Sequence, residues 1–385
     1  MLPRERVIAA LEHREPDLIP WGEHSIDYNI YEMVLGRPTL VQAKFPGTKV
    51  LWEGGYDQVV ASHKRDVVDL ALALGFDIIT APIMPERSWN KPMEKIDEET
   101  YRDEDGNLFR ISATTHDLMP YKLNVDAYKP TTAAQMDAEI ARLRAEGVAE
   151  PSADQLAVIR DIVKRMKGTH YIASCVGDIS FPTWGIDMED GLVNMMLYPE
   201  LRAKVNEAAG LHQIGMLKHY AAVGLDAVIP CGDYGSSTGL LASPEIFREH
   251  TFPWLKKYCD EAHRLGLKVI KHSCGCIWEV MDMLVEAGYD GYEAIQKSAG
   301  MDIRRLKKLY GGRLTLWGNV TNEKLILGST KEVREDARYC IKWGAPGGGF
   351  IYGASHSLAV GTKYENLMEM KACRERWGVY PIRVK

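Results

Sequence analysis

Short apolar runs alternate with longer segments of helical periodicity along most of the chain. The apolar runs occupy residues 18–22, 76–81, 170–175, 227–231, 269–272, 291–295, 314–317 and 349–352. They lack the strict polar alternation of a strand with one wet face, which is typical of parallel strands covered on both sides by crossover helices. We therefore predict eight parallel strands separated by helices.

Eight such strands predict a (β/α)8 TIM barrel, whose core takes roughly 250 residues and leaves room for insertions. The alternative is a doubly wound open sheet, but no Gly-x-Gly-x-x-Gly turn follows the first strand. Residues 3–14 predict a helix and residues 30–62 an irregular segment, and residues 93–112 alternate as a β-hairpin. We expect one domain over residues 1–385, with a helical and irregular N-terminal segment and a β-hairpin insertion at about residues 82–150.

The composition limits the kinds of partner and the cellular location that we expect for the protein. The formal net charge is -6 and no basic face is evident, which argues against nucleic acid. No apolar stretch approaches the roughly 18 residues of a membrane span, and the first residues lack a signal-peptide core. The seven cysteines lack the spacing of a disulfide framework, so we predict a cytoplasmic protein.

Polar residues follow most of the predicted strands, at the end of a barrel where chemistry takes place. The stability of a barrel does not require such a group of polar side chains at its rim. The candidates are Glu23, His24, Asp178, Asp233, Tyr234, His272, Cys274, Glu293, Gln296, Trp317, Asn319 and His356.

A zinc site is the most specific interpretation of these residues. His272 and Cys274 are two positions apart at a strand end, so their side chains project from one face. An imidazole and a thiolate suit zinc, which takes further ligands from other strands. Cys276 has the same parity, but Gly275 turns the chain before it. The predicted ligands are His272, Cys274, His356 and Glu293.

Two of the assignments have alternatives. His356 is equally well interpreted as a polar rim residue that binds a substrate carboxylate or a backbone carbonyl. Asp233 is a candidate general base, a residue that orients a ligand, or the N-cap of a helix.

The chain resembles the uroporphyrinogen decarboxylase superfamily over nearly its whole length. The resemblance rests on residues 6–11 (Arg-Val-Ile-Ala-Ala-Leu), 16–20 (Pro-Asp-Leu-Ile-Pro), 243–247 (Ser-Pro-Glu-Ile-Phe), 272–275 (His-Ser-Cys-Gly), 318–319 (Gly-Asn), 328–333 (Gly-Ser-Thr-Lys-Glu-Val), 347–351 (Gly-Gly-Gly-Phe-Ile), 356 (His), 361–362 (Gly-Thr) and 365–366 (Glu-Asn). This family has a (β/α)8 barrel.

The superfamily contains decarboxylases and zinc- and cobalamin-dependent methyltransferases. The decarboxylases carry an Arg-Gln-Ala-Gly-Arg motif after the first strand, where this chain has Trp-Gly-Glu-His-Ser-Ile at residues 21–26. A tetrapyrrole with many carboxylates is therefore a poor substrate. The methyltransferases carry a His-x-Cys motif, which His272 and Cys274 match, and Glu293 stands where their acidic ligand is expected. Their later cysteine is replaced by His356, as in the decarboxylase branch.

The resemblance implies a zinc-dependent methyltransferase that moves a methyl group between a small substrate and a corrinoid (cobalamin) held by a partner protein. The chain itself lacks an Asp-x-His-x-x-Gly cobalamin loop. Because the later cysteine thiolate of the methyltransferases is absent here, the favoured substrate is a methyl ether, above all a methoxylated aromatic. The reaction would then be O-demethylation. The predicted catalytic residues are Asp233, Glu293 and His24, and the predicted substrate-binding residues are Glu23, Asp178, Tyr234, Gln296, Trp317 and Asn319.

Two other functions remain open from the sequence. One is a decarboxylating lyase that acts on a smaller carboxylic acid, and the other is a barrel that carries a corrinoid or tetrapyrrole without catalysis. A thiol or amine as methyl donor and assembly as a homodimer also stay open.

Overall fold

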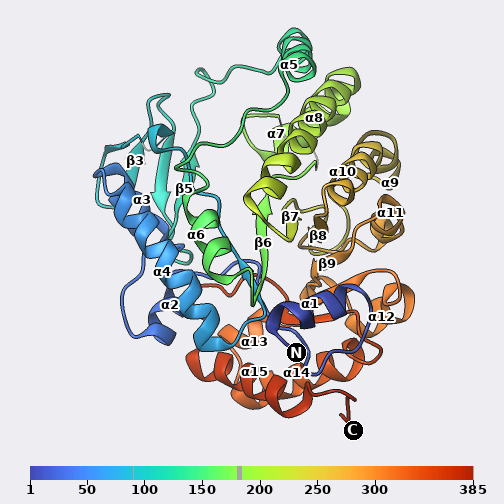
Figure 1. Ribbon diagram of the computed structural model, residues 1–385. Coiled ribbons are helices and arrows are strands. Elements are labelled where there is room, and N and C mark those ends of the chain that lie inside the picture. The colour runs from blue at the N-terminus through green and yellow to red at the C-terminus, as the bar shows by residue number, and fades with distance from the viewer. Residues whose placement is uncertain (90, 180–183, 385) are drawn as a thin grey trace.

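A curled sheet of seven parallel strands is the centre of the computed structural model, which describes residues 1–89, 91–179 and 184–384 (Figure 1). The strands follow one another around the sheet in chain order, as a (β/α)8 barrel requires. They are β1 (Ile78–Thr80), β6 (Tyr171–Val176), β7 (Ala227–Pro230), β8 (Lys268–His272), β9 (Gly291–Ala294), β10 (Thr315–Val320) and β11 (Phe350–Ala354).

The predicted first strand closes this sheet as a short connection rather than as a full strand. On one side, the Tyr352 N–H donates to the Pro20 carbonyl over 2.8 Å. On the other, the Asp77 N–H donates to the Trp21 carbonyl over 2.7 Å. Pro20 has no N–H to extend the ladder, which limits its length. Residues 20–22 thus join β11 to β1, and the predicted fold class is confirmed.

Helices surround the sheet, and α1 lies beneath it in Figure 1. Helix α1 contacts β1, β6 and β11, so it covers the end where the strands begin. The helices are α1 (Pro3–Leu11), α2 (Tyr28–Leu35), α3 (Lys44–Trp52), α4 (Tyr56–Leu74), α5 (Ala133–Glu146), α6 (Ala157–Met166), α7 (Met188–Leu197), α8 (Pro199–Val223), α9 (Pro244–Ile246), α10 (Phe252–Arg264), α11 (Met281–Ala287), α12 (Ile303–Tyr310), α13 (Asn322–Ile326), α14 (Thr330–Gly344) and α15 (Tyr364–Trp377), with short turns η1 (Arg87–Trp89), η2 (Phe247–Thr251), η3 (Trp278–Val280) and η4 (Lys297–Ala299). Among the described residues, no helix combines the length and apolarity needed to cross a membrane.

Two predictions about connecting segments were incomplete. Residues 30–62 are mostly helical, since α2, α3 and the start of α4 lie there. The predicted hairpin corresponds to β3 (Thr100–Arg102) and β4 (Leu108–Ile111). β2 (Glu94–Lys95) and β5 (Leu118–Lys122) extend it to a four-stranded antiparallel sheet. Because β2 and β5 are almost wholly exposed, they lack the apolar alternation that marks a strand in the sequence.

The interior of the barrel changes character along the strands. Near α1 it is a buried apolar cluster that includes Tyr171, Ile270, Trp317 and Ile351. Two residues beyond Ile270, the same face of β8 presents His272. The barrel is therefore filled with apolar side chains at one end and carries polar side chains at the other.

Candidate metal and active site

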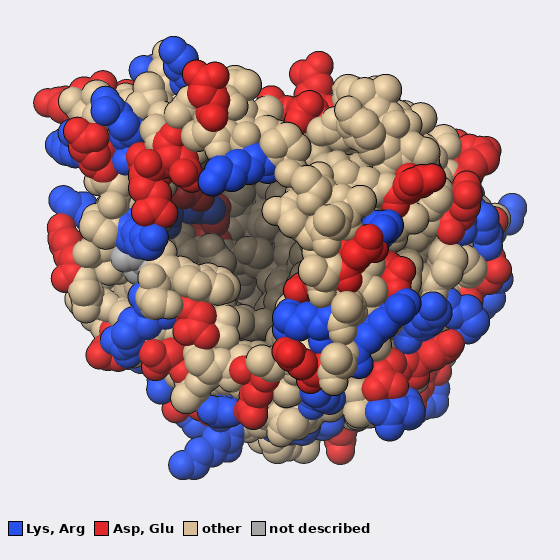
Figure 2. All heavy atoms as spheres, turned by 90° about the horizontal axis from the view of Figure 1, so that it is seen from above, with Lys and Arg blue, Asp and Glu red and all other residues tan. Residues whose placement is uncertain are grey.

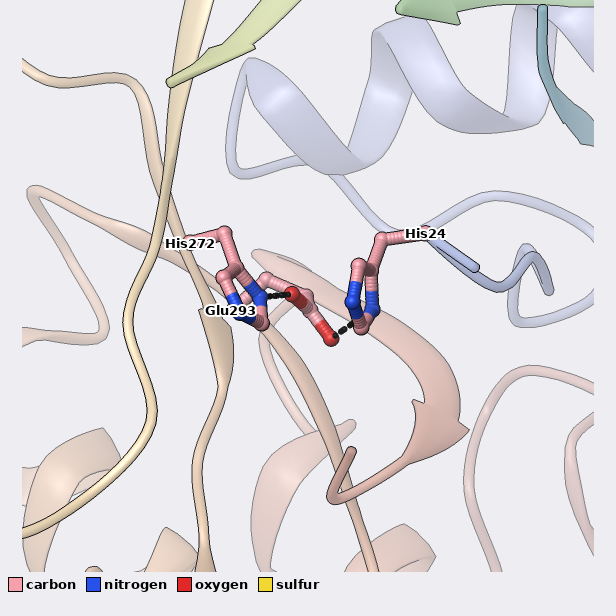
Figure 3. Close-up of side chains that lie close together, drawn as sticks. All are labelled: His24, His272 and Glu293. Atoms are coloured by element: carbon pink, nitrogen blue, oxygen red, sulfur yellow. Dashed lines mark hydrogen bonds and ion pairs between the residues drawn. The ribbon is translucent and has the colours of Figure 1, made fainter. Parts of the chain in front are cut away.

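Four chain segments bring polar side chains together where the strands end. His272 is the last residue of β8 and pairs in register with Glu293 of β9. His24 follows the closing residues 20–22, and Asp233 follows β7. His24, His272 and Glu293 are all buried and face one another (Figure 3). The structure thus joins three of the predicted site residues into one cluster.

The Glu293 carboxylate bridges the Nδ1 atoms of the two imidazole rings. Its Oε1 is 3.0 Å from Nδ1 of His24, and its Oε2 is in contact with Nδ1 of His272. The centres of the two rings are 4.2 Å apart. Burial acts to raise the pKa of Glu293, but the attraction of His24 and His272 is larger in sum and lowers it to about 2. Glu293 is therefore an ionised group that orients both histidines.

The other nitrogen of His272 faces a second group of donors. Nε2 of His272 is 3.6 Å from Sγ of Cys274 and 3.7 Å from Oδ1 of Asp233. The backbone N–H of Cys274 donates to the same Asp233 oxygen over 2.8 Å, which holds that carboxylate in place. The three ligand atoms lie within 4.8 Å of one another. His272 is thus shared by two groups, one on each ring nitrogen.

The group at Nε2 fits a zinc ion. Zinc binds nitrogen at about 2.0 Å and sulfur at about 2.3 Å in a tetrahedron, which sets the nitrogen and sulfur about 3.5 Å apart. The 3.6 Å between His272 and Cys274 matches this separation. Burial raises the pKa of the Cys274 thiol, and Asp233 and Glu293 raise it further, so the thiol stays protonated unless a cation is bound. Imidazole, sulfur and carboxylate together form a typical zinc donor set.

His356 lies outside both groups. Its ring centre is 6.5 Å from that of His24, at an interplanar angle of 72°. Its Nδ1 accepts the Ser357 N–H over 2.8 Å, and burial lowers its pKa, which favours a neutral ring. His24 reaches the same loop, because its Nε2 is 3.2 Å from the Ser357 hydroxyl. The role of His356 as a metal ligand stays a prediction.

Glu23 anchors the chain segment that carries His24. Its buried carboxylate accepts the indole N–H of Trp21 over 3.0 Å and the N–H of Ala354. Burial raises the pKa of Glu23 to about 8, against the effect of these donors and with a contribution from Glu293. Glu23 therefore ties the segment that carries His24 to the end of β11.

Asp178 and Tyr234 contact a buried lysine that was not among the site residues predicted from the sequence. Lys271 forms an ion pair with Asp178, and its Nζ donates to the Gly232 carbonyl over 2.7 Å and lies 3.9 Å from the centre of the Tyr234 ring. Since Lys271 neighbours His272 in β8, it points to the opposite face of the sheet. The sequence feature that could have identified Lys271 is the presence of a lysine within an otherwise apolar strand. Lys271 positions Gly232, next to Asp233.

The remaining candidates bind the backbone. Gln296 accepts the Gly275 N–H over 2.8 Å, and Trp317 donates its indole N–H to the Gly22 carbonyl over 2.9 Å within the apolar end of the barrel. Asn319 donates to the carbonyls of Ile295 and Met301. These three side chains hold loops and strands together, and their roles in substrate binding stay predictions.

A closed barrel with histidine, cysteine and carboxylate donors at its C-terminal end defines a (β/α)8 protein with a candidate metal site. The family described as uroporphyrinogen decarboxylase (URO-D) matches residues 121–377, and the chain belongs to this family. None of the curated proteins matches the chain.

One solved structure shares the fold. A methyltransferase from Methanosarcina mazei superposes with a TM-score of 0.65 at 16% identity, over 98% of this chain and 99% of that one. A dihydropteroate synthase from Anaplasma phagocytophilum has a TM-score of 0.30 at 14% identity, over 84% of this chain and 93% of that one. The first supports the same barrel over the whole chain, and the second is too dissimilar to inform the site.

Proposed function

We propose that the protein is a zinc-dependent methyltransferase that moves a methyl group between a small methylated substrate and the corrinoid of a partner protein. The observation that carries this proposal is the group of three donors formed by Nε2 of His272, Sγ of Cys274 and Oδ1 of Asp233. Membership of the URO-D family and the overall likeness to a structure named as a methyltransferase support it.

In this proposal His272, Cys274 and Asp233 hold the zinc, and a fourth position takes the substrate. Asp233 replaces Glu293 in the ligand set predicted from the sequence, because Glu293 contacts the other nitrogen of His272. A carboxylate at Nδ1 keeps the proton there and leaves the Nε2 lone pair for the metal. His356 is assigned to the rim, where it contacts the substrate.

Bound zinc supplies Lewis acidity to the heteroatom that carries the methyl group, and the reduced corrinoid supplies the nucleophile. The protein's own groups position the metal ligands and supply a proton to the leaving group. Glu293 fixes the ring of His272, and the N–H of Cys274 fixes Asp233. His24 is held by Glu293 at Nδ1 and lies beside the Ser357 hydroxyl at Nε2, where it can hold a proton for the leaving group.

Access for a large cofactor favours the same function. Figure 2, seen from above, looks onto the end of the barrel opposite α1 and shows a deep central hollow with lysine, arginine, aspartate and glutamate side chains around its rim. A corrinoid carried by another protein needs an opening of this kind. The mixed charge of the rim fits a protein partner better than a nucleic acid.

Zinc analysis combined with a methylation assay tests the proposal. The purified protein is expected to bind one zinc ion and to form methylcobalamin from Co(I) cobalamin and a methyl ether. His272→Ala and Cys274→Ala should lose the zinc and lower the rate at least about 10³-fold, since a metal contributes several kcal/mol to such a step. His212→Ala, on the exposed side of α8, is the matched control and should change neither quantity.

Three results would contradict the proposal. Full zinc occupancy in His272→Ala would reject the ligand assignment. A zinc-loaded protein that makes no methylcobalamin from any ether, thiol or amine would instead favour the decarboxylating lyase, and tight binding of cobalamin without turnover would favour a carrier.

A further inference from the structure

Two hydrogen bonds from β8 hold the segment after β7 in which Asp233 lies. Nζ of Lys271 donates to the Gly232 carbonyl over 2.7 Å, and the N–H of Cys274 donates to Oδ1 of Asp233 over 2.8 Å. Lys271 reaches this segment from the outer face of the sheet, because it neighbours His272, which faces the metal group. The Gly232 carbonyl belongs to the peptide bond that precedes Asp233. Lys271 therefore acts on Asp233 through that peptide group.

The backbone itself restrains this segment only weakly against β8. The regular pairing of β7 with β8 covers two residues of each strand, followed by a single bridge between Cys231 and His272. Pro230, the last residue of β7, has no N–H to continue the ladder. The Gly232 N–H donates to the His272 carbonyl over 3.5 Å, which is the outer limit of a hydrogen bond. The 2.7 Å bond from Lys271 is therefore a main restraint on the segment.

The Lys271 side chain is fully buried, which is unfavourable for a charged group. Asp178, in the loop after β6, forms an ion pair with it and is itself only 2% exposed. The Tyr234 ring centre lies 3.9 Å from Nζ and adds a cation–π contact. Replacing a buried ion pair by uncharged side chains of similar size is often neutral or stabilising. Stability alone therefore gives no reason for this pair, and its bond to Gly232 indicates a role in the site.

We infer that Lys271 is a positioning residue that holds Asp233 at the zinc site, and that Asp178 balances its charge inside the protein. This inference rests on the proposed function and adds to it a residue that contacts neither the metal nor the substrate. Lys271 then acts only through Asp233. Its substitution should weaken zinc binding when Asp233 is present and have no further effect once Asp233 has been removed.

The test removes both charges, because Lys271→Met alone would leave the buried Asp178 without its partner. The double variant Lys271→Met/Asp178→Asn should bind zinc roughly 10–100-fold more weakly in competition with a chelator. In its metal-free form it should resist urea at least as well as the wild type. Lys268→Met/Asp290→Asn is the matched control, since it removes a lysine–aspartate pair at the other end of β8, and it should leave zinc affinity unchanged.

Asp233→Ala supplies the background that distinguishes a positioning role from a general structural one. In that background the double variant should change zinc affinity by less than about threefold, since interaction is lost when one partner is absent. The absorption spectrum of the cobalt(II)-substituted protein should likewise shift in the double variant only when Asp233 is present. An equal loss of zinc affinity with and without Asp233 overturns the inference. Wild-type zinc affinity or loss of folding in the double variant also overturns it.

His272→Ala separates failure of this inference from failure of the proposed function. If His272→Ala loses zinc and the double variant keeps wild-type affinity, only the role of Lys271 is rejected. If His272→Ala keeps its zinc, the proposed site is rejected and the inference with it. Weaker zinc binding in the double variant, acting through Asp233 in a protein that transfers no methyl group, keeps the role of Lys271 and rejects methyl transfer.

Discussion

The two ends of the barrel interior use the same strands for opposite purposes. On β8, Ile270 belongs to the apolar cluster near α1, and His272, two residues later, belongs to the polar cluster. Burying apolar side chains stabilises the fold, whereas burying a carboxylate and two imidazoles costs free energy unless they pair. The free energy gained by burial at the apolar end therefore offsets the cost of the charged cluster at the polar end. Substitutions at the two ends should therefore separate stability from metal binding.

The largest effect on stability is expected at the apolar end. Trp317→Ala should lower the free energy of unfolding by about 3–5 kcal/mol, because it leaves a cavity and removes the hydrogen bond to the Gly22 carbonyl. Urea unfolding measures the change. Trp89→Ala is the control, since Trp89 is 70% exposed. If Trp317→Ala folds normally but loses zinc, the division between the two ends is wrong.

At the polar end, Glu293→Gln should weaken zinc binding roughly 10–100-fold, which is the usual effect of removing a group that orients a metal ligand. Competition with a chelator measures the affinity. The amide keeps the shape of the side chain but cannot hold the His272 ring with a full charge. Complete loss of zinc, as expected for His272→Ala, would show that Glu293 binds the metal itself.

The smallest effect is expected for His356→Ala. Since His356 lies outside both groups of donors, its loss should change zinc affinity by no more than about 0.5 kcal/mol, as for most substitutions away from a specific contact. The same chelator competition applies. A loss as large as that of Cys274→Ala would restore His356 to the ligand set predicted from the sequence.

The regular alternation of short apolar runs with helical segments made much of the barrel and part of the site predictable. The apolar runs located seven strands and the closing segment, and the period of two placed His272 and Cys274 on one face. Glu293 was predicted from the end of its strand and from the family resemblance, and its register pairing places it beside His272. These features are local or follow from the order of strands.

Other features depend on backbone angles or distant partners that a sequence pattern does not contain. Asn319 follows Gly318, and both have positive φ, of 83° and 119° respectively, so its side chain does not follow the simple alternation of β10. Asp178 pairs with Lys271, 93 positions away. The position of His24 against Glu293 depends on how residues 20–22 close the sheet.

This closure constrains the order of events when the chain folds. Residues 20–22 bond to Tyr352, more than three hundred positions later, so the sheet keeps an open edge until β11 has been synthesised. Contacts this distant in sequence form late, because the intervening chain must be ordered first. His24 follows the same closing segment and meets Glu293 of β9, so a ribosome-bound intermediate that ends before β11 holds this segment from the β1 side alone and presents an unpaired strand edge, the kind of surface that chaperones protect.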